Sequence, residues 1–200
     1  TSQHLDALAT AQLSALETRD LVLIPTAAIA GIGDDIVGLT TAQVLALTSA
    51  QVINLTTRQL SYLGTDQVAT LETADLQGLT TQAVQAFSTS QLNAISTAGL
   101  AVLTTNQLVS GLNQSIAYLG TAQINALTTV QWANLGSHQA ASLTTTQLQV
   151  VDTADISSLS TQAVAAMTST QFNVLSTQDI AALTTQQMLS GVGTDFVGFG

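Results

Sequence analysis

Residues 39–46 read LTTAQVLA, and this octad repeats with few changes through most of the chain. With Leu39 as position one, position one is large and apolar, position two is Thr, Ser or a relative, and position five is usually Gln. Position six is apolar and position eight is mostly small. Further octads begin at Leu47, Leu55, Leu63, Leu71, Leu79, Phe87, Ile95 and Leu103, and then at Leu119, Leu127, Leu135, Leu143, Val151, Leu159, Met167, Leu175 and Leu183.

The eight-residue period is incompatible with one long helix and with one uninterrupted strand. Eight residues exceed two helical turns by roughly 80°, so the apolar stripe would wind around a continuous helix. Positions one and six are five residues apart, which would place them on opposite faces of a strand. Ala and Gln, both abundant here, are also poor strand formers.

One short helix per octad satisfies the pattern. Thr40 and Gln43 form a capping box, in which the hydroxyl accepts from the Gln43 backbone and the Gln43 side chain reaches back. Leu39 and Val44 flank the cap as a hydrophobic staple. The octad therefore predicts a helix of about six residues that begins after each position-two Thr.

A helix of this length is too short to be stable alone in water. We therefore predict an all-α fold, a tight α-solenoid in which stacked octads share a core made by positions one and six. Small residues at position eight would let neighbouring helices approach closely; they include Ala46, Ala86, Ala94, Ala126, Ala166 and Ala182. A β-solenoid with Thr and Gln ladders is the alternative.

A longer repeat of 80 residues lies over the octads. The sequence GIGDDIVG at residues 31–38 interrupts the pattern, and similar breaks begin at Gly111 and Gly191. Residues 31–110 and 111–190 are identical at 35 of 80 positions. We expect a bend or a phase adjustment at each break, because Gly permits positive φ.

The chain is predicted to be a single continuous array over residues 1–200. Its super-repeats are 1–30 (partial), 31–110, 111–190 and 191–200 (partial). Pro25 takes a cap position, where a helix can begin without losing a needed hydrogen bond. Solenoids normally carry polar terminal caps, and none is visible, so we expect a longer array or ends that stack on other copies.

The composition excludes several classes of partner. Net charge is −10, charged residues make up 7%, and the only cations are Arg19 and Arg58. Nucleic acids and anionic membrane surfaces both require clustered Lys and Arg. The longest apolar run, residues 21–32, contains Pro25 and is too short to cross a bilayer, so no membrane insertion is expected.

The lack of Cys removes disulfides and thiolate chemistry. An acidic, Cys-free, Lys-free and Thr-rich repeat is typical of a secreted bacterial protein. The expected location is therefore extracellular or at the cell surface.

Candidate metal ligands are few. Asp34 and Asp35 suggest calcium, but an isolated pair lacks the six to eight oxygens that this ion prefers. His4 and His138 have no partner at ligand spacing, and His138 falls at the exposed position four. We expect no metal and no cofactor.

No residue combination predicts catalysis. The many Ser and Thr residues fill cap positions, and none is marked as a nucleophile beside a base. A phosphate loop is excluded because the chain has no Lys. The chain is therefore predicted not to be an enzyme.

The remaining singular residues have structural interpretations. Core positions are expected for Phe87, Trp132, Met167 and Phe172, whereas Tyr62 and Tyr118 at position eight could lie at the surface or in a seam between helices. Asn54 and Asn113 begin glycosylation sequons that a polar sequence produces by chance. Position-three Thr residues could form a regular array able to bind ice.

The LTTxQ motifs at residues 39–43, 103–107, 127–131, 143–147 and 183–187 carry a family resemblance. The sequence resembles the Thr/Gln-rich short-repeat arrays of giant secreted or surface adhesin-like proteins of Gram-negative bacteria. The resemblance implies extracellular presentation and a structural or adhesive role, and transfers no binding residue. Some relatives are labelled for haem utilisation, but neither His of this chain lies in a haem-binding context.

The leading functional hypothesis is a non-enzymatic structural repeat protein. It would form an extracellular fibre or stalk by head-to-tail contact with itself, because unlike surfaces that join in this way propagate. The alternative is an adhesin segment whose solenoid surface binds a glycan, a host surface or ice. An enzyme is the third hypothesis, and it would require titratable groups that converge.

Overall fold

The computed structural model describes residues 8–191, and short helices with no strand account for the regular structure in this range. The predicted all-α solenoid is confirmed, and the β-solenoid alternative is wrong. The chain divides after Leu103 into two compact units, the second of which begins at Thr104. The two units are described in turn.

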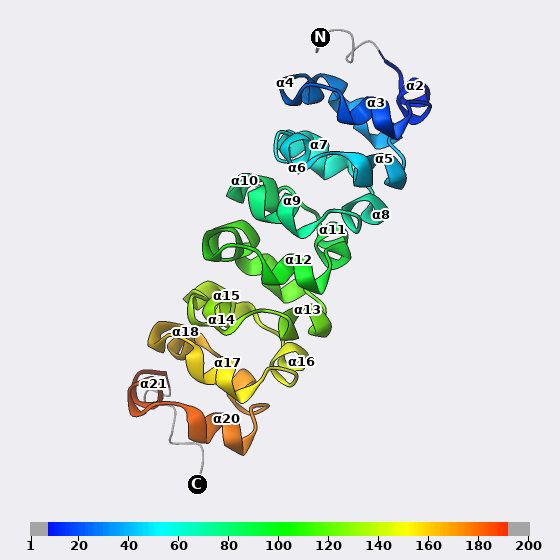
Figure 1. Cartoon of the computed structure of the whole chain (residues 1–200). Coiled ribbons are helices and arrows are strands. Elements are labelled where there is room, and N and C mark those ends of the chain that lie inside the picture. The colour runs from blue at the N-terminus through cyan, green and yellow to red at the C-terminus, as the bar shows by residue number, and fades with distance from the viewer. Residues whose placement is uncertain (1–7, 192–200) are drawn as a thin grey trace. The chain divides into compact units, whose positions relative to one another are not determined.

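In unit 1, each helix stacks on the helix three octads earlier, so that one solenoid turn contains three octads. The three columns are α3, α5, α8 and α11; α4, α6, α9 and α12; and α2, η1, α7 and α10 (Figure 1). The elements are α2 (Thr10–Ser14), α3 (Thr18–Val22), α4 (Thr26–Ile29), the 3₁₀ segment η1 (Ala30–Gly38), α5 (Thr41–Ala46), α6 (Ser49–Val52), α7 (Thr57–Tyr62), α8 (Thr65–Val68), α9 (Thr73–Gly78), α10 (Thr81–Gln85), α11 (Thr89–Ala94) and α12 (Thr97–Ala101).

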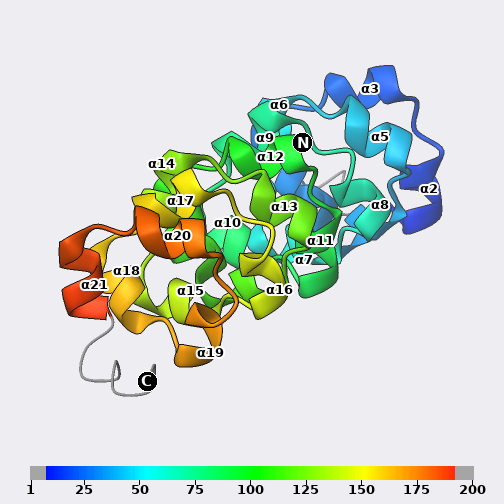
Figure 2. The ribbon, with the colours of Figure 1, turned by 90° about the horizontal axis from the view of Figure 1, so that it is seen from below.

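Unit 2 repeats this arrangement. Its columns are α13, α16 and α19; α14, α17 and α20; and η3, α15, α18 and α21 (Figure 2). The elements are the π-helix η2 (Gln107–Leu112), the 3₁₀ helix η3 (Asn113–Tyr118), α13 (Thr121–Asn125), α14 (Thr129–Ala133), α15 (Ser137–Ser142), α16 (Thr145–Leu148), α17 (Thr153–Ser158), α18 (Thr161–Ala166), α19 (Ser169–Phe172), α20 (Thr177–Ala182) and α21 (Thr185–Gly191).

The predicted capping boxes begin most of these helices. The Gln43 backbone N–H donates to Thr40 Oγ1 at 3.2 Å, and the Thr40 N–H donates to Gln43 Oε1 at 2.7 Å. Where Gly64 replaces the cap residue, its N–H still donates to Gln67 Oε1 at 2.6 Å. The cap residue itself is extended, with φ −74° and ψ 161° at Thr40, so each octad turns a corner before its helix begins.

The position-five Gln side chains also join successive turns, which the capping motif alone does not require. Gln91 is buried, and its Nε2 donates to the carbonyls of Leu60 and Leu63, both at 2.8 Å. Gln147 makes the equivalent bonds to Ile116 at 2.9 Å and Leu119 at 2.8 Å. We call this arrangement, one Gln amide on two carbonyls of the previous turn, the glutamine clamp.

Positions one and six form the predicted core. Leu127, Phe87, Trp132 and Met167 are all buried. Phe172, also predicted to be core, is only half-buried, because α19 belongs to the last described turn of unit 2.

The role predicted for small residues at position eight is confirmed at Gly78. A Cβ atom on this residue would lie 2.5 Å from Ile53 Cγ2 of the previous turn. Here position seven of one octad meets position eight of the octad three further on, whereas Gly38 and Ser158, also at position eight, contact the position-three residues Thr10 and Thr129.

The breaks differ from ordinary octads because the helix continues through positions one and two. Gly31 and Gly111 replace the large residue of position one, and the buried Ile32 and Leu112 replace the cap. Positive φ occurs, as predicted, but two residues after each of these Gly residues, at Gly33 (59°) and Asn113 (45°). The third break follows Gly191, and residues 192–200 lie outside the described range.

The two described breaks also differ in length. Residues 24–30 form a segment of seven residues before Gly31, whereas residues 103–110 form a full octad before Gly111. The shorter segment runs into a 3₁₀ helix and the longer one into a π-helix. Because a π-helix holds more residues per turn than a 3₁₀ helix, the apolar side chains at both ends of Ile29–Ile32 and of Leu108–Leu112 remain buried.

Candidate functional site

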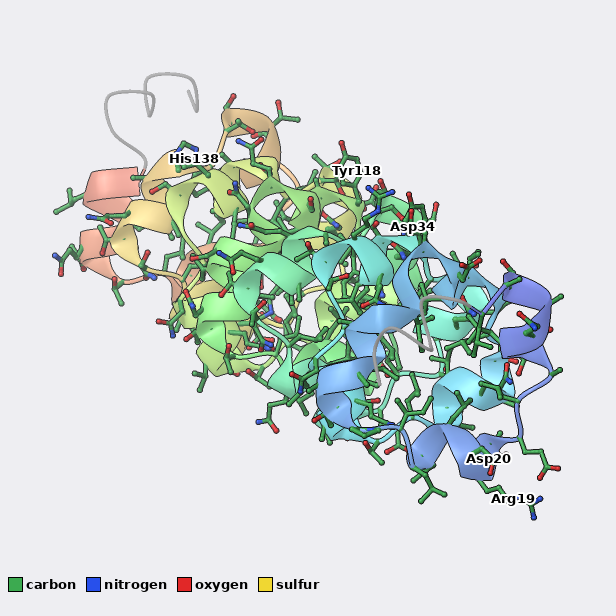
Figure 3. All side chains as sticks on the ribbon, turned by 90° about the horizontal axis from the view of Figure 1, so that it is seen from above. Arg19, Asp20, Asp34, Tyr118 and His138 are labelled. Carbon is green, nitrogen blue, oxygen red and sulfur yellow. The ribbon has the colours of Figure 1, made fainter. Side chains whose placement is uncertain are left out.

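The two acids considered for calcium point to different partners. Arg58 Nε and Nη2 donate to Asp34 at 2.6 and 2.5 Å, which joins α7 to η1. Arg58 Nη2 also donates to Tyr62 Oη at 3.2 Å, and its guanidinium lies 5.4 Å from the centre of the Tyr62 ring. Hydrogen bonding to Arg58 holds the pKa of Asp34 below its ordinary value. Figure 3 shows Asp34 on the surface.

Asp35 occupies position five and makes a bond to the previous turn. Its Oδ1 accepts from Thr10 Oγ1 at 2.6 Å. Asp179, at the same octad position in unit 2, accepts from Thr153 Oγ1 at 2.6 Å. At these two octads, an Asp in place of the clamp Gln is held by a position-three hydroxyl.

Two opposing effects act on the Asp179 carboxyl. Burial raises its pKa. Hydrogen bonds from the Thr153 hydroxyl and from the hydroxyl and N–H of Ser176 lower the pKa by more than burial raises it, so the pKa lies below its ordinary value. The ionised form is therefore the one that the fold stabilises.

Asp155, also buried at position five, accepts no bond from a position-three hydroxyl in residues 8–191. Its Oδ1 is buried without a hydrogen-bond partner among the described residues. The Nε1 atom of Trp132, on the contacting helix α14, is also buried without a hydrogen-bond partner among the described residues. A Gln at position 155 would instead supply a donor to the previous turn.

The histidines form no ligand cluster in the described structure. His138 is exposed on α15, as predicted, and Figure 3 shows it on the outside of that helix. His4 lies outside the described residues. Across residues 8–191, no three His, Cys, Asp or Glu side chains gather closely enough to hold a metal ion.

Other singular residues lie at the surface. Tyr62 and Tyr118 are 41% and 59% exposed, which resolves the choice between surface and seam in favour of the surface. Asn54 and Asn113 are also exposed. Arg19 and Asp20 project from α3 (Figure 3), where Arg19 pairs with Glu17 at 2.7 Å.

Within the described range, no helix is long and apolar enough to cross a membrane.

The glutamine clamp is the feature that sequence reasoning missed. A capping box accepts Glu as readily as Gln, yet no octad has Glu at position five. Asp, Ala and Gly do occur at position five, as at Asp75, Ala83 and Gly99, so a donor is favoured there but is not required. The preference for Gln over Glu at position five was the signal in the sequence that could have indicated the clamp.

Short capped helices in three columns, joined turn to turn by buried Gln side chains, define an α-solenoid repeat protein. The chain belongs to the ALTTAQ repeat family, whose model matches residues 36–73, 68–105 and 148–185. No curated protein matches the chain.

Proposed function

We propose that this chain is a non-enzymatic structural protein that builds an extracellular fibre or stalk by head-to-tail association with itself. The observation that carries the proposal is a contact between turns that recurs in both units. In both units a Gln amide of one turn donates to two carbonyls of the turn before it, as Gln91 and Gln147 do. Because the same contact joins successive turns, it is also suited to join the last turn of one copy to the first turn of another and so to extend a fibre.

The surface chemistry supports a structural role. Position-two Thr side chains such as Thr40, Thr48 and Thr56 are exposed, but their hydroxyls are used to cap helices. Charge is scarce at 7%, which disfavours nucleic acid as a partner. The extracellular location rests on composition, namely the lack of Cys and Lys and the abundance of Thr, Ser and Gln.

Electron microscopy of the purified chain at neutral pH tests this function. Long uniform fibres that appear with rising protein concentration are the expected result. Discrete particles of constant size at all concentrations would contradict it.

A binding segment is the second candidate, and Tyr62 favours it. This exposed ring lies beside Arg58 and Asp34, which pair through two hydrogen bonds on a surface with few other charges. An aromatic face next to a planar charged pair is suited to stacking and hydrogen bonding with a sugar. Calorimetric titration of neutral oligosaccharides should give heat that is lost in Tyr62→Ala and kept in Tyr118→Ala. Equal behaviour of the two variants would exclude this role for Tyr62.

A further inference from the structure

The two surfaces of a solenoid turn can be assigned from burial. In the first octads of unit 1, Leu8 and Leu16 are half-buried and Gln12 is exposed, whereas Leu13 and Leu21 at position six are fully buried. Positions one and five of a turn are therefore covered by the turn before it, and position six by the turn after it.

The last octads of unit 2 show the opposite pattern. Gln171 at position five is buried, whereas Phe172 and Ile180 at position six are only half-buried. We define the leading face as Leu8, Gln12, Leu16, Asp20 and Leu23, and the trailing face as Phe172, Leu175, Ile180, Thr185 and Leu189. Each face presents the half of the turn-to-turn contact that the other lacks.

We propose that the leading face of one copy docks on the trailing face of a second copy, with the glutamine clamp of Gln12 closing on the carbonyls of Phe172 and Leu175. The proposal rests on the proposed function and names its contact surface. Gln12 already uses its Oε1 to accept the Ala9 N–H at 2.8 Å, and its exposed side chain has the amide donor that clamp residues use. Among the described residues, no Gln amide reaches the carbonyls of Phe172 or Leu175.

One register satisfies three relationships together. In this register, octad 8–15 of one copy lies one turn, or three octads, beyond octad 175–182 of the other. Gln12 then has the same relationship to Phe172 and Leu175 that Gln91 has to Leu60 and Leu63. Asp20 then faces Thr185, in the relationship that Asp179 has to Thr153.

The same register pairs Leu23 with Leu189. Leu189 at position seven and Leu23 at position eight then have the relationship that Ile53 has to the Gly78 site in unit 1. They are 76% and 78% exposed, more than the other large hydrophobic residues of the described chain. Docking therefore covers both leucines, which favours a second copy as the occupant.

Cross-linking between singly substituted chains tests the register, because the protein has no Cys of its own. Leu23→Cys and Leu189→Cys chains, mixed and oxidised mildly, should give a disulfide-linked heterodimer. A mixture of Leu23→Cys with Val130→Cys, whose position is 66% exposed on α14, should not. Leu23→Cys homodimers, or equal cross-linking with Val130→Cys, would overturn the proposed register.

A second measurement separates this proposal from the proposed function. Gln12→Ala should weaken self-association about tenfold in sedimentation velocity, since one clamp is lost, and the exposed Gln82→Ala is the matched control. Fibres with unchanged affinity in Gln12→Ala would reject this contact and leave the proposed function intact. Absence of any association in the unmodified chain would reject both.

Discussion

Gln91 Nε2 lies 2.8 Å from the carbonyl oxygen of Leu60, which precedes it by 31 residues. Gln91→Glu preserves size and the acceptor for the Ser88 N–H but places a carboxylate against two carbonyls. We expect a loss of about 3 kcal/mol in the free energy of unfolding, measured by urea denaturation. The exposed Gln82→Glu should change stability by less than about 0.5 kcal/mol. Similar losses in the two variants would mean that the clamp contributes little.

Asp155→Gln should stabilise the protein. The substitution removes a buried carboxylate oxygen that has no partner among the described residues and supplies the amide used at other octads. A gain of about 1–2 kcal/mol is expected in the free energy of unfolding. Trp132, the single tryptophan, reports the transition by fluorescence. Asp66→Gln, at an exposed position of unit 1, should have no effect, and a gain there as large as at Asp155 would point to net charge instead.

Asn113→Gly should also be stabilising, because Asn113 has φ 45° and ψ −129°, a conformation that favours Gly. Gly33→Ala, at the matching position 80 residues earlier, should cost about 1–3 kcal/mol. Thermal unfolding of both variants measures the two opposite shifts. If Gly33→Ala unfolds at the temperature of the unmodified chain, the positive φ there is not required.

Gly78→Ala should destabilise the stack of α6 and α9 although Ala is the better helix former. The added methyl would meet Ile53 Cγ2, whose β-branched side chain has little freedom to move. A loss of about 1–2 kcal/mol is expected. In a double-mutant cycle, Ile53→Ala should remove most of this loss. Additive effects would show that the two residues do not press on each other.

Thr153→Val should make the protein more sensitive to acid. The pKa of Asp179 is lowered in the folded state, so its contribution to stability is complete above the unfolded pKa of about 3.9 and is lost as pH falls through the folded value. Removing the Thr153 hydroxyl raises the folded pKa. Acid unfolding followed by circular dichroism should therefore move to higher pH, whereas Thr146→Val, at an exposed position, should leave it unchanged.

Much of this fold could be predicted from the residues of a single octad. Thr40 and Gln43 specify where a helix begins, and the short period limits its length, so the capped helices and the apolar core could be predicted. The number of helices per turn could not, because it depends on the angle at which Leu39 and Thr40 turn the chain between helices. That angle is set by packing between turns.

The clamp was missed for a related reason. The capping box of Gln43 is complete within three residues, so a single octad does not show that the Gln43 amide also donates to the carbonyls of Leu13 and Leu16 in the previous turn, both at 2.8 Å. Likewise, Asp34 and Asp35 are adjacent in sequence but bond to Arg58 and Thr10 on different elements. Partners a full turn away are determined only by the stacking.

The change of helix type at the breaks has a consequence for how such an array evolves. Deleting one residue inside an ordinary octad would move the core and cap residues that follow it in that octad out of position. At residues 24–30 a one-residue deletion relative to residues 103–110 is absorbed within a single helical turn, as a 3₁₀ helix replaces a π-helix. The breaks are therefore points at which duplicated blocks can be joined imperfectly and still keep their register, so recombination can lengthen the array without exact splicing.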